Sequence, residues 1–395
     1  MDFTDEDRRQ LAEHGISEAE AARQLAVLRG PAPRVRLDRA CTVGDGIERW
    51  DDTVVERLAA IGGRLGAFIP ASGAASRMFK DLAAGDGPAI EKFLAGRDRF
   101  AFEIPGGDDP ARAVVERYAN LPKGLLPFHA GGLTPFHEHL VEAEALGLTG
   151  IHFTVSPEHE AAFRALAQGA KIPVGFSTQA PSTDTLAADG EGRPFRDASG
   201  RLLLRPAGHG ALIGNLEASG GDLVLLKNID NVAAAPWKAP TYLWTRALLG
   251  RLLEHERSDR PLRICGMVPN TGEPGGGPFW VDGTRQIVES AQIDLGDPEQ
   301  KRIFSGATHF NPVFMVCALR DVDGRPYRLA DFVDQNAAIV TRKSSGGREL
   351  VALERPGLWN GAMAGWDTVF VEVPLAVFNP VKTVNDLLRR EHQGG

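Results

Sequence analysis

The sequence predicts an α/β protein. Short apolar runs bounded by turn-forming residues indicate buried strands at 65–70, 150–155, 171–177, 223–226, 262–268 and 367–373. Helical patterns lie between them, as at 109–120 and 241–255. The chain has 395 residues, of which 43% are hydrophobic, so it can bury a large core. This length suggests two domains, or one large α/β domain with additions.

Composition and charge limit the partners and the compartment. The formal net charge is -8, and acidic and basic residues are mixed along the chain. Because no basic tract is present, a nucleic-acid polymer is not an expected partner. Cys41, Cys265 and Cys317 are isolated in the sequence, which favours a reducing compartment over a disulfide framework. Neither a signal-peptide core nor an apolar run near the ~20 residues of a membrane span is found. We expect a cytoplasmic protein with no membrane partner.

Residues 1–50 are expected to form a helical N-terminal segment. Thr4 precedes an acidic first turn, and Ser17-Glu-Ala-Glu has the spacing of a capping box. Pro31 and Pro33 then interrupt the helical pattern. We therefore expect two parts, the helical segment 1–50 and an α/β domain over 51–395 that ends in a lobe of strand and helix.

The strand predicted at 223–226 leads into the polar stretch Lys227-Asn228-Ile229-Asp230-Asn231. Ligands of open α/β sheets bind beyond the carboxyl ends of the strands. Asp230 is therefore a candidate for contact with a substrate or a metal ion. The competing interpretation is an ordinary exit from a strand, because Asn and Asp favour turns.

The strand predicted at 65–70 runs into a loop of small residues that contains Ser72, Gly73 and Ala74 and is followed by Arg77 and Lys80. Small residues permit close approach of the backbone, and a helix start offers amide donors to an anion. These features predict a phosphate-binding loop at a strand-loop-helix junction, although the Gly-Lys-Ser/Thr ending of a Walker loop is absent. The alternative is a small-residue turn packed beneath the sheet.

Two other loops carry candidate contacts to a ligand. Gln179 follows the strand predicted at 171–177, and its amide has the donors and the acceptor needed to read a base edge or sugar hydroxyls. Gly208 and Gly210 allow a ligand to approach the backbone on both sides of His209.

A turn-rich run at 270–278 can surround a small polar ligand. It contains Asn270, Glu273 and Gly276. A hairpin with a favoured Asp-Gly turn at 282–283 follows, and its second strand is expected to carry Glu289.

Three histidines raise the alternative of a metal site. His137 and His139 are two apart on a predicted helix and point in different directions, whereas zinc helices use an i, i+4 spacing. His129 lies in the preceding loop. A metalloenzyme built on these histidines is the less favoured alternative, because helical histidines are more often solvated or hydrogen-bonded.

The order of the motifs resembles the UDP-sugar pyrophosphorylase superfamily of nucleotidyltransferases. Pro206 with Gly208-His209-Gly210 is similar to its Pro-Gly-His-Gly loop, and Asn228-Ile-Asp-Asn231 to the strand-end motif whose aspartate holds magnesium. Gly276 to Gln292 resembles its two-glycine turn and the strand that follows, and Phe310-Asn311 its Phe-Asn pair. Pro380-Val-Lys382-Thr and Asp386-Leu-Leu resemble its closing motifs, whose lysine touches the phosphates. The whole chain also resembles the bacterial domain-of-unknown-function family 4301, which implies no activity.

The resemblance implies a Rossmann-like, GT-A-like mixed sheet with helices on both faces, and it implies a role for each candidate. Four residues would be catalytic, and one of them, Asp230, would hold Mg²⁺ or Mn²⁺: Arg77, Lys80, Asp230 and Lys382. The residues implied to bind the nucleotide are Ser72, Gly73, Ala74, Gln179, Gly208, His209 and Asn228. Those implied to surround the sugar phosphate are Asn270, Glu273, Gly276, Glu289 and Asn311.

The first loop departs from the family pattern, because it has fewer glycines and lacks the Lys-Gly-Pro ending. Position 211 is Ala where the family usually has Asp. The expected activity is transfer of a nucleotidyl group, by resemblance uridylyl, from a nucleoside triphosphate to a sugar 1-phosphate, which releases pyrophosphate. The altered loop motivates a rival interpretation, a nucleotide-sugar-binding protein without catalysis.

Overall fold

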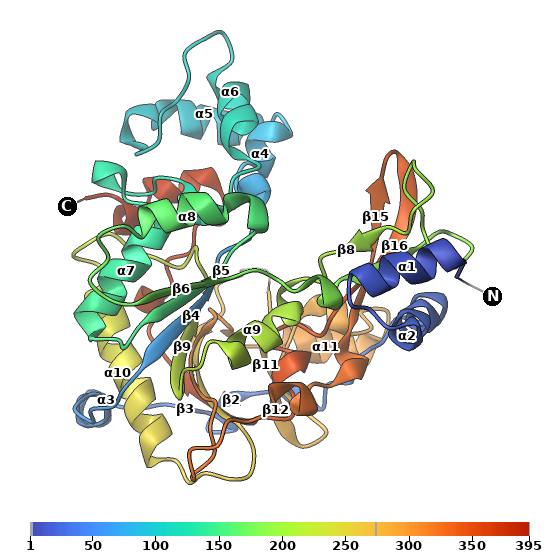
Figure 1. The fold of residues 1–395 in the computed structure, drawn as a ribbon. Helices are drawn as coiled ribbons and strands as arrows, with labels where there is room; N and C mark the ends of the chain where they lie inside the picture. The colour runs from blue at the N-terminus through green and yellow to red at the C-terminus, as the bar shows by residue number, and fades with distance from the viewer. Residues whose placement is uncertain (1–2, 273–274, 395) are drawn as a thin grey trace.

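The computed structural model describes residues 3–272 and 275–394, which form a mixed α/β structure (Figure 1). The α-helices are α1 Asp5–Glu13, α2 Glu18–Arg29, α3 Asp52–Ala59, α4 Lys80–Ala83, α5 Gly87–Ala95, α6 Pro110–Tyr118, α7 Pro135–Leu146, α8 Glu160–Leu166, α9 Ile213–Ala218, α10 Ala239–Glu254 and α11 Pro298–Ser305.

The strands form one large sheet and two small ones. Their bounds are β1 Arg39–Ala40, β2 Thr42–Val43, β3 Gly46–Glu48, β4 Gly66–Pro70, β5 Ile151–Thr154, β6 Val174–Ser177, β7 Thr185–Ala188, β8 Leu204–Arg205, β9 Leu223–Lys227, β10 Leu262–Pro269, β11 Gly277–Val281, β12 Thr284–Val288, β13 His309–Phe310, β14 Phe314–Ala318, β15 Ile339–Ser345, β16 Arg348–Glu354 and β17 Asp367–Glu372.

The ten-stranded sheet has the order β2-β3-β17-β10-β14-β9-β4-β5-β6, with β13 paired to β10. Neighbouring strands along this order are parallel except at β14, which runs antiparallel to both β9 and β10. The carboxyl ends of β4, β6, β9, β10 and β17 therefore meet at one edge of the sheet. This confirms the predicted mixed sheet and brings the loops after these strands to the same side of the molecule.

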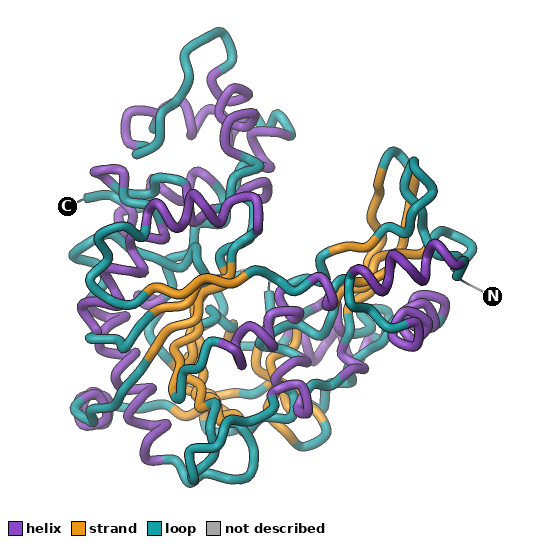
Figure 2. Tube along the Cα trace, in the orientation of Figure 1, coloured by secondary structure: helices purple, strands orange, loops and turns teal. Residues whose placement is uncertain are grey.

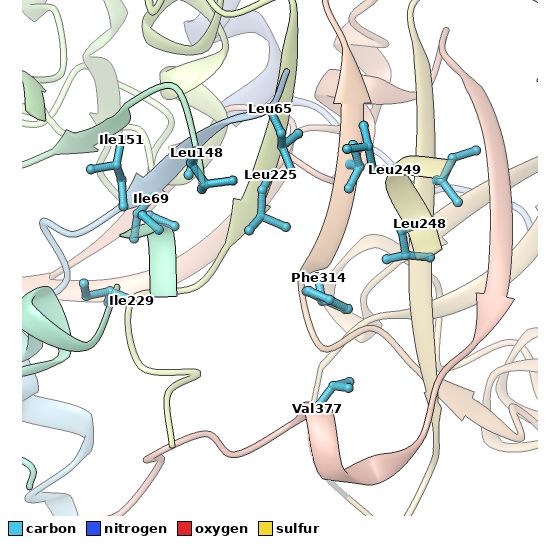
Figure 3. Close-up of a cluster of buried hydrophobic side chains, with 14 of the residues drawn as sticks. Leu65, Ile69, Leu148, Ile151, Leu225, Ile229, Leu248, Leu249, Phe314 and Val377 are labelled. Carbon is cyan, nitrogen blue, oxygen red and sulfur yellow. The ribbon is translucent and has the colours of Figure 1, made fainter. Parts of the chain in front are cut away.

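Helices cover both faces of this sheet. On one face α7, α8 and α10 bury Phe136, Phe163 and Leu248 in one core. Leu225 of β9 belongs to the same core, and Figure 3 shows it with Leu248. On the other face α9 and several single helical turns pack over Val224 and Leu226. Successive residues of β9 thus serve opposite faces, which is why the four residues from Leu223 to Leu226 are all apolar.

Two smaller units extend from the sheet (Figure 2). Helices α4, α5 and α6 enclose a separate aromatic cluster into which the C-terminal residues Val381, Val384 and Leu387 are inserted. Helices α1 and α2 pack against the four-stranded sheet β15-β16-β7-β8, which lies on the right in Figure 1.

The predicted helical segment 1–50 contains α1 and α2, and the expected caps at Thr4 and Ser17 are present. Residues 39–48 were expected to belong to that segment but are extended. They form β1, β2 and β3, and β3 pairs with β17 of the large sheet. The division of the chain at residue 50 stays a prediction.

Across residues 3–272 and 275–394, no helix combines the length and the apolar character needed to cross a bilayer.

A buried ion pair joins β9 to α7. Lys227 ends β9 on the same face as Leu225, and its ammonium group donates to both carboxylate oxygens of Glu142 at 2.8 and 2.9 Å. Burial by itself would raise the pKa of Glu142, but Lys227 and the other cationic neighbours outweigh it and the net pKa is lowered. The side chains of Lys227 and Glu142 are 1% and 5% exposed, so each depends on the other for compensation of its charge.

Lys227→Met should lower the free energy of unfolding by about 3 to 5 kcal/mol, because it leaves the Glu142 carboxylate buried without its partner. The double variant Lys227→Met with Glu142→Leu should recover most of this loss. Urea unfolding measures both. Arg112→Ala is the control, since it removes an exposed pair with Glu116 on α6 and should change little. Equal losses in the single and double variants would contradict this account.

Candidate functional site

Asp230 lies at the carboxyl end of β9, in the turn that follows the strand, and is 6% exposed. Its Oδ2 accepts a hydrogen bond from Lys123 Nζ at 2.7 Å and lies 3.5 Å from Lys382 Nζ. Burial alone would raise the pKa of Asp230, but Lys382 and Lys123 more than offset it, and the net pKa is lowered. The carboxylate is therefore ionised at neutral pH. Lys123, Asp230 and Lys382 are called the lysine–aspartate cluster below.

Lys123 is a site residue that the sequence analysis missed. It begins a helical turn (Lys123–Leu125), its ammonium group also donates to the carbonyl of Val381 at 2.7 Å, and its amide donates to the carbonyl of Gly73 at 3.1 Å. It lies in the segment before α7, which is rich in glycine and proline. A cation in a turn-rich segment was the only sign in the sequence that Lys123 could belong to a site. Its partner Asp230 is 107 residues away in the chain, so the sequence does not show that the two residues meet.

The C-terminal motif lies against the turn that contains Asp230. Pro380 forms a bridge with Asn231, and the amide of Val381 donates to the carbonyl of Asp230 at 3.2 Å. The amide of Lys382 donates to the Asp386 carboxylate at 2.8 Å, and Asp386 also completes a capping box with Thr383. The backbone at Lys382 is thus fixed, while its side chain is 47% exposed and its ammonium group is able to reach a ligand.

The first loop keeps the exposure that phosphate binding requires. Ser72, Gly73 and Ala74 are exposed, and Ala74 forms a bridge with Pro122, next to Lys123. The α-helix expected directly after the loop does not form. A single turn ends at Arg77, and α4 begins at Lys80 and has only four residues. Pairing of this segment with residues 121–122 replaces the first helical turn that the sequence pattern favoured.

Arg77 and Lys80 are exposed, as the predicted roles require. Burial lowers the pKa of His209 and the Arg77 guanidinium adds to this shift, whereas burial raises the pKa of Glu289 and Arg77 weakly opposes that rise. The backbone of the first loop contacts the segment of Lys123, and the charge of Arg77 acts on both His209 and Glu289.

His209 follows Gly208, which has a φ of 76° and is therefore strained for any side-chain-bearing residue. A Cβ at position 208 would also lie 3.2 Å from the Glu354 carboxylate. The imidazole of His209 is half-buried, accepts a hydrogen bond at Nδ1 from the amide of Leu358 at 2.8 Å, and stacks on Trp359 with ring centroids 4.0 Å apart. Glu354, Leu358 and Trp359 were not selected from the sequence.

Glu289 was expected on the second strand of the hairpin but lies one residue beyond β12, where it precedes a helical turn. The hairpin itself and its Asp282-Gly283 turn are confirmed. Burial raises the pKa of the Glu289 carboxyl, and Trp359 and Asn360 partly counter this shift. Its Cγ lies 3.1 Å from where a Cβ at Gly276 would be, so the glycine leaves room for this carboxylate.

Three of the remaining predicted ligand contacts already have hydrogen-bond partners within the protein. The Asn311 side-chain oxygen, in a residue 4% exposed, accepts from the amide of Val313 at 3.0 Å. The exposed Asn270 accepts from the amide of Gly272 at 2.9 Å, and Gln179 donates to Asp184 at 3.1 Å. Asn228 is half-buried beside Asp230, and Glu273 lies outside the described residues. Ligand contacts by these residues stay predictions.

The three histidines of the alternative metal site do not converge. His129 pairs with Glu138 at 2.5 Å, His137 is close to the Thr134 hydroxyl at 3.1 Å, and His139 Nε2 lies 3.2 Å from the carbonyl of Ile229. Among residues 3–272 and 275–394, no group of three or more His, Cys, Asp or Glu side chains is arranged to hold a metal ion. The arrangement disfavours a histidine metalloenzyme.

The donor chemistry at Asp230 fits a magnesium ion that is shared with phosphates. Mg²⁺ commonly takes one or two protein carboxylates, several waters and substrate phosphate oxygens. Asp230 supplies one ionised carboxylate, and the lysines beside it can turn to phosphate oxygens. The same lysines neutralise Asp230, so the geometry does not favour an ion without phosphates.

The fold is that of the Rossmann-like nucleotidyltransferases. UDP-glucose phosphorylase from Trypanosoma brucei aligns over 97% of this chain and 77% of its own, with a TM-score of 0.59 and 15% identity. UDP-N-acetylglucosamine pyrophosphorylase from the same organism aligns over 98% and 81%, with a TM-score of 0.58 and 15% identity. A point mutant of UDP-glucose pyrophosphorylase from Leishmania major, in complex with UDP-glucose, aligns over 97% and 77%, with a TM-score of 0.54 and 14% identity.

The family described as domain of unknown function 4301 (DUF4301) matches residues 4–92, 115–258 and 254–393. The chain belongs to this family. A search of curated proteins finds no significant match. The family membership and the resemblance in fold to UDP-sugar pyrophosphorylases confirm the two similarities expected from the sequence motifs.

The two lysines of the lysine–aspartate cluster should differ in their effect on stability. Lys123→Met removes the closer partner of a buried carboxylate and should lower the free energy of unfolding by about 2 kcal/mol. Lys382→Met should change it much less, because the Lys382 side chain is 47% exposed against 12% for Lys123. Urea unfolding at pH 7 measures the difference. Equal losses would show that the two lysines do not differ in this way.

Proposed function

We propose that the chain is a sugar-1-phosphate nucleotidyltransferase that makes a nucleotide-sugar and pyrophosphate. The observation that carries the proposal is the lysine–aspartate cluster at the carboxyl end of β9, with the exposed first loop beside it. Two cations and one carboxylate at the ligand-binding edge of a nucleotidyltransferase fold suit the handling of phosphates. The finer proposal that the nucleotide is uridylyl is supported by the relatives in fold, which are named for UDP-sugars.

The reaction needs alignment and neutralisation of charge rather than a protein nucleophile. A phosphate oxygen of the sugar 1-phosphate attacks the α-phosphorus of the nucleoside triphosphate, the new P–O bond forms, and the bond to pyrophosphate breaks. In this proposal Lys382 neutralises charge on the α-phosphate and on the leaving pyrophosphate, a role supported by its fixed backbone and half-exposed side chain. Arg77 and Lys80 carry exposed cations on the first loop for the triphosphate.

Asp230 would hold the magnesium ion, which when bound supplies further neutralisation of phosphate charge. Lys123 keeps the carboxylate of Asp230 in place and ties it to the backbone of the C-terminal motif. The proposed sugar side is the region of Glu289 and Gly276, where a carboxylate can accept hydrogen bonds from hydroxyl groups.

Pyrophosphate release from mixtures of a nucleoside triphosphate, a sugar 1-phosphate and Mg²⁺ tests the proposal. Lys382→Ala should lower kcat about a hundredfold or more, as expected for loss of one charge-stabilising group. Lys301→Ala, at an exposed lysine of α11, is the matched control and should leave turnover unchanged. Excess chelator should abolish turnover. Thermal stabilisation by a nucleotide-sugar without turnover would instead favour the non-catalytic binding protein.

Glu289→Gln should mainly raise KM for the sugar phosphate, by about tenfold, because hydrogen bonds to sugar hydroxyls persist from the ground state to the transition state. KM for the nucleotide should stay near the parent value. Steady-state kinetics with each substrate varied separately make the comparison. A raised nucleotide KM with an unchanged sugar KM would place Glu289 on the nucleotide side of the site.

A further inference from the structure

The segment Gly357–Asn360 makes three kinds of contact around His209 and is called the Trp359 corner. The amide of Leu358 donates to Nδ1 of the imidazole at 2.8 Å. The indole of Trp359 stacks on the imidazole at an interplanar angle of 12°. A Cβ on Gly357 would lie 2.8 Å from Cε1 of His209, so the imidazole packs directly against this backbone. The corner thus fixes both the plane and the rotation of the ring.

The hydrogen bond from Leu358 also decides the protonation of the ring. A backbone N–H can only donate, so Nδ1 must accept with its lone pair and carries no proton. A neutral imidazole in this state bears its proton on Nε2. Within the described residues 3–272 and 275–394, the ring has no hydrogen-bond partner other than Leu358. The Nε2–H donor is therefore left for a ligand.

Hydrogen bonds from Arg263 and from the Asn360 side chain hold the Trp359 corner in place. Arg263, 0% exposed, donates from Nη1 to the carbonyl of Trp359 at 2.7 Å and from Nε to the Thr368 hydroxyl at 2.9 Å. The Asn360 amide donates to the carbonyl of Ile287 at 3.2 Å and to the Gln292 side chain at 3.1 Å, on either side of Glu289. One segment therefore fixes the surroundings of two candidate ligand contacts, His209 and Glu289.

We propose that the Trp359 corner positions His209 as a neutral imidazole with its proton on Nε2, which donates one hydrogen bond to an oxygen of the bound nucleotide. Trp359 is a positioning residue in this scheme. The ligand part of the inference rests on the proposed function, whereas the state of the ring does not.

The charged groups around the ring support a neutral state. Burial lowers the pKa of His209 to about 4, Glu354 of β16 opposes this shift, and Arg77 of the first loop adds to it. Protonation at Nδ1 would also break the hydrogen bond from Leu358. The imidazole should therefore stay neutral, with no change in tautomer, between pH 5.5 and 8, where an ordinary histidine titrates near pH 6.5.

The state of the ring is measured on the free protein by long-range ¹⁵N–¹H NMR with ¹⁵N-labelled histidine, His209 being assigned through His209→Gln. Nδ1 should have the shift of an unprotonated nitrogen and Nε2 that of a protonated one, unchanged from pH 5.5 to 8. A proton on Nδ1, or titration near pH 6.5, would overturn the proposal even in an active enzyme.

Variants test the ligand part by isothermal titration with nucleoside triphosphates and the matching nucleosides. His209→Phe keeps a ring but no donor and should weaken triphosphate binding about tenfold, the worth of one hydrogen bond. His209→Gln keeps a donor amide and should bind more tightly than His209→Phe. A loss shared by the nucleoside places the acceptor on the ribose or base, and a loss confined to the triphosphate places it on the phosphates. Equal affinity of both variants and the parent, or no nucleotide binding by the parent, overturns this part.

Trp359→Leu should mix the two tautomers of His209 and raise the nucleotide KM with little change in kcat, whereas Trp359→Phe should restore the single tautomer. Trp366→Leu, a change of the same size in the same hydrophobic cluster, is the control and should leave the ring unchanged. Equal effects of Trp359→Leu and Trp366→Leu on the ring would show that Trp359 only fills space, which overturns its positioning role.

Discussion

The carboxylate of Asp230 holds together three segments that are far apart in the sequence. Lys123 comes from the loop before α7, Asp230 from the end of β9, and Lys382 from the C-terminal motif. A buried carboxylate needs compensation of its charge, and here both compensating cations come from other segments. Backbone hydrogen bonds reinforce the junction, from Val381 to Asp230 and from Lys123 to Gly73. The shape of the candidate site therefore depends on one charge and its two partners.

A layer of buried polar groups supports this junction from α7. Glu142 pairs with Lys227, and Glu138 pairs with Lys238 and with His129, which in turn lies 3.0 Å from His392 near the C-terminus. The carbonyl of Ile229, next to Asp230 in the chain, lies 3.2 Å from Nε2 of His139 in this layer. Such groups tolerate few alternative packings, because each would leave a charge unpaired. The end of β9 and the C-terminal tail are thereby fixed against the same helix.

A second part of the candidate site surrounds His209. The Trp359 corner holds His209 through a backbone amide and an aromatic ring, and the buried Arg263 donates to the carbonyl of Trp359. The two parts suit different tasks. The lysine–aspartate cluster provides charges that can exchange partners when phosphates arrive, whereas the corner provides a donor whose direction is fixed before binding.

The sequence by itself determined the α/β class, the mixed sheet, the hairpin at 282–283 and the family resemblance, because these follow from local periodicity, turn chemistry and ordered motifs. It also indicated Asp230 and Lys382 as residues of one site. It did not reveal Lys123, Leu358, Trp359 or Arg263, because their roles arise from contacts across 96 to 258 residues of chain. The strands within 39–48 and the lost helical turn after Ala74 were likewise decided by pairing with distant backbone. Only the tertiary structure determines which charged residues pair, because the partners are far apart in the chain and the residue type alone does not specify its neighbours in space.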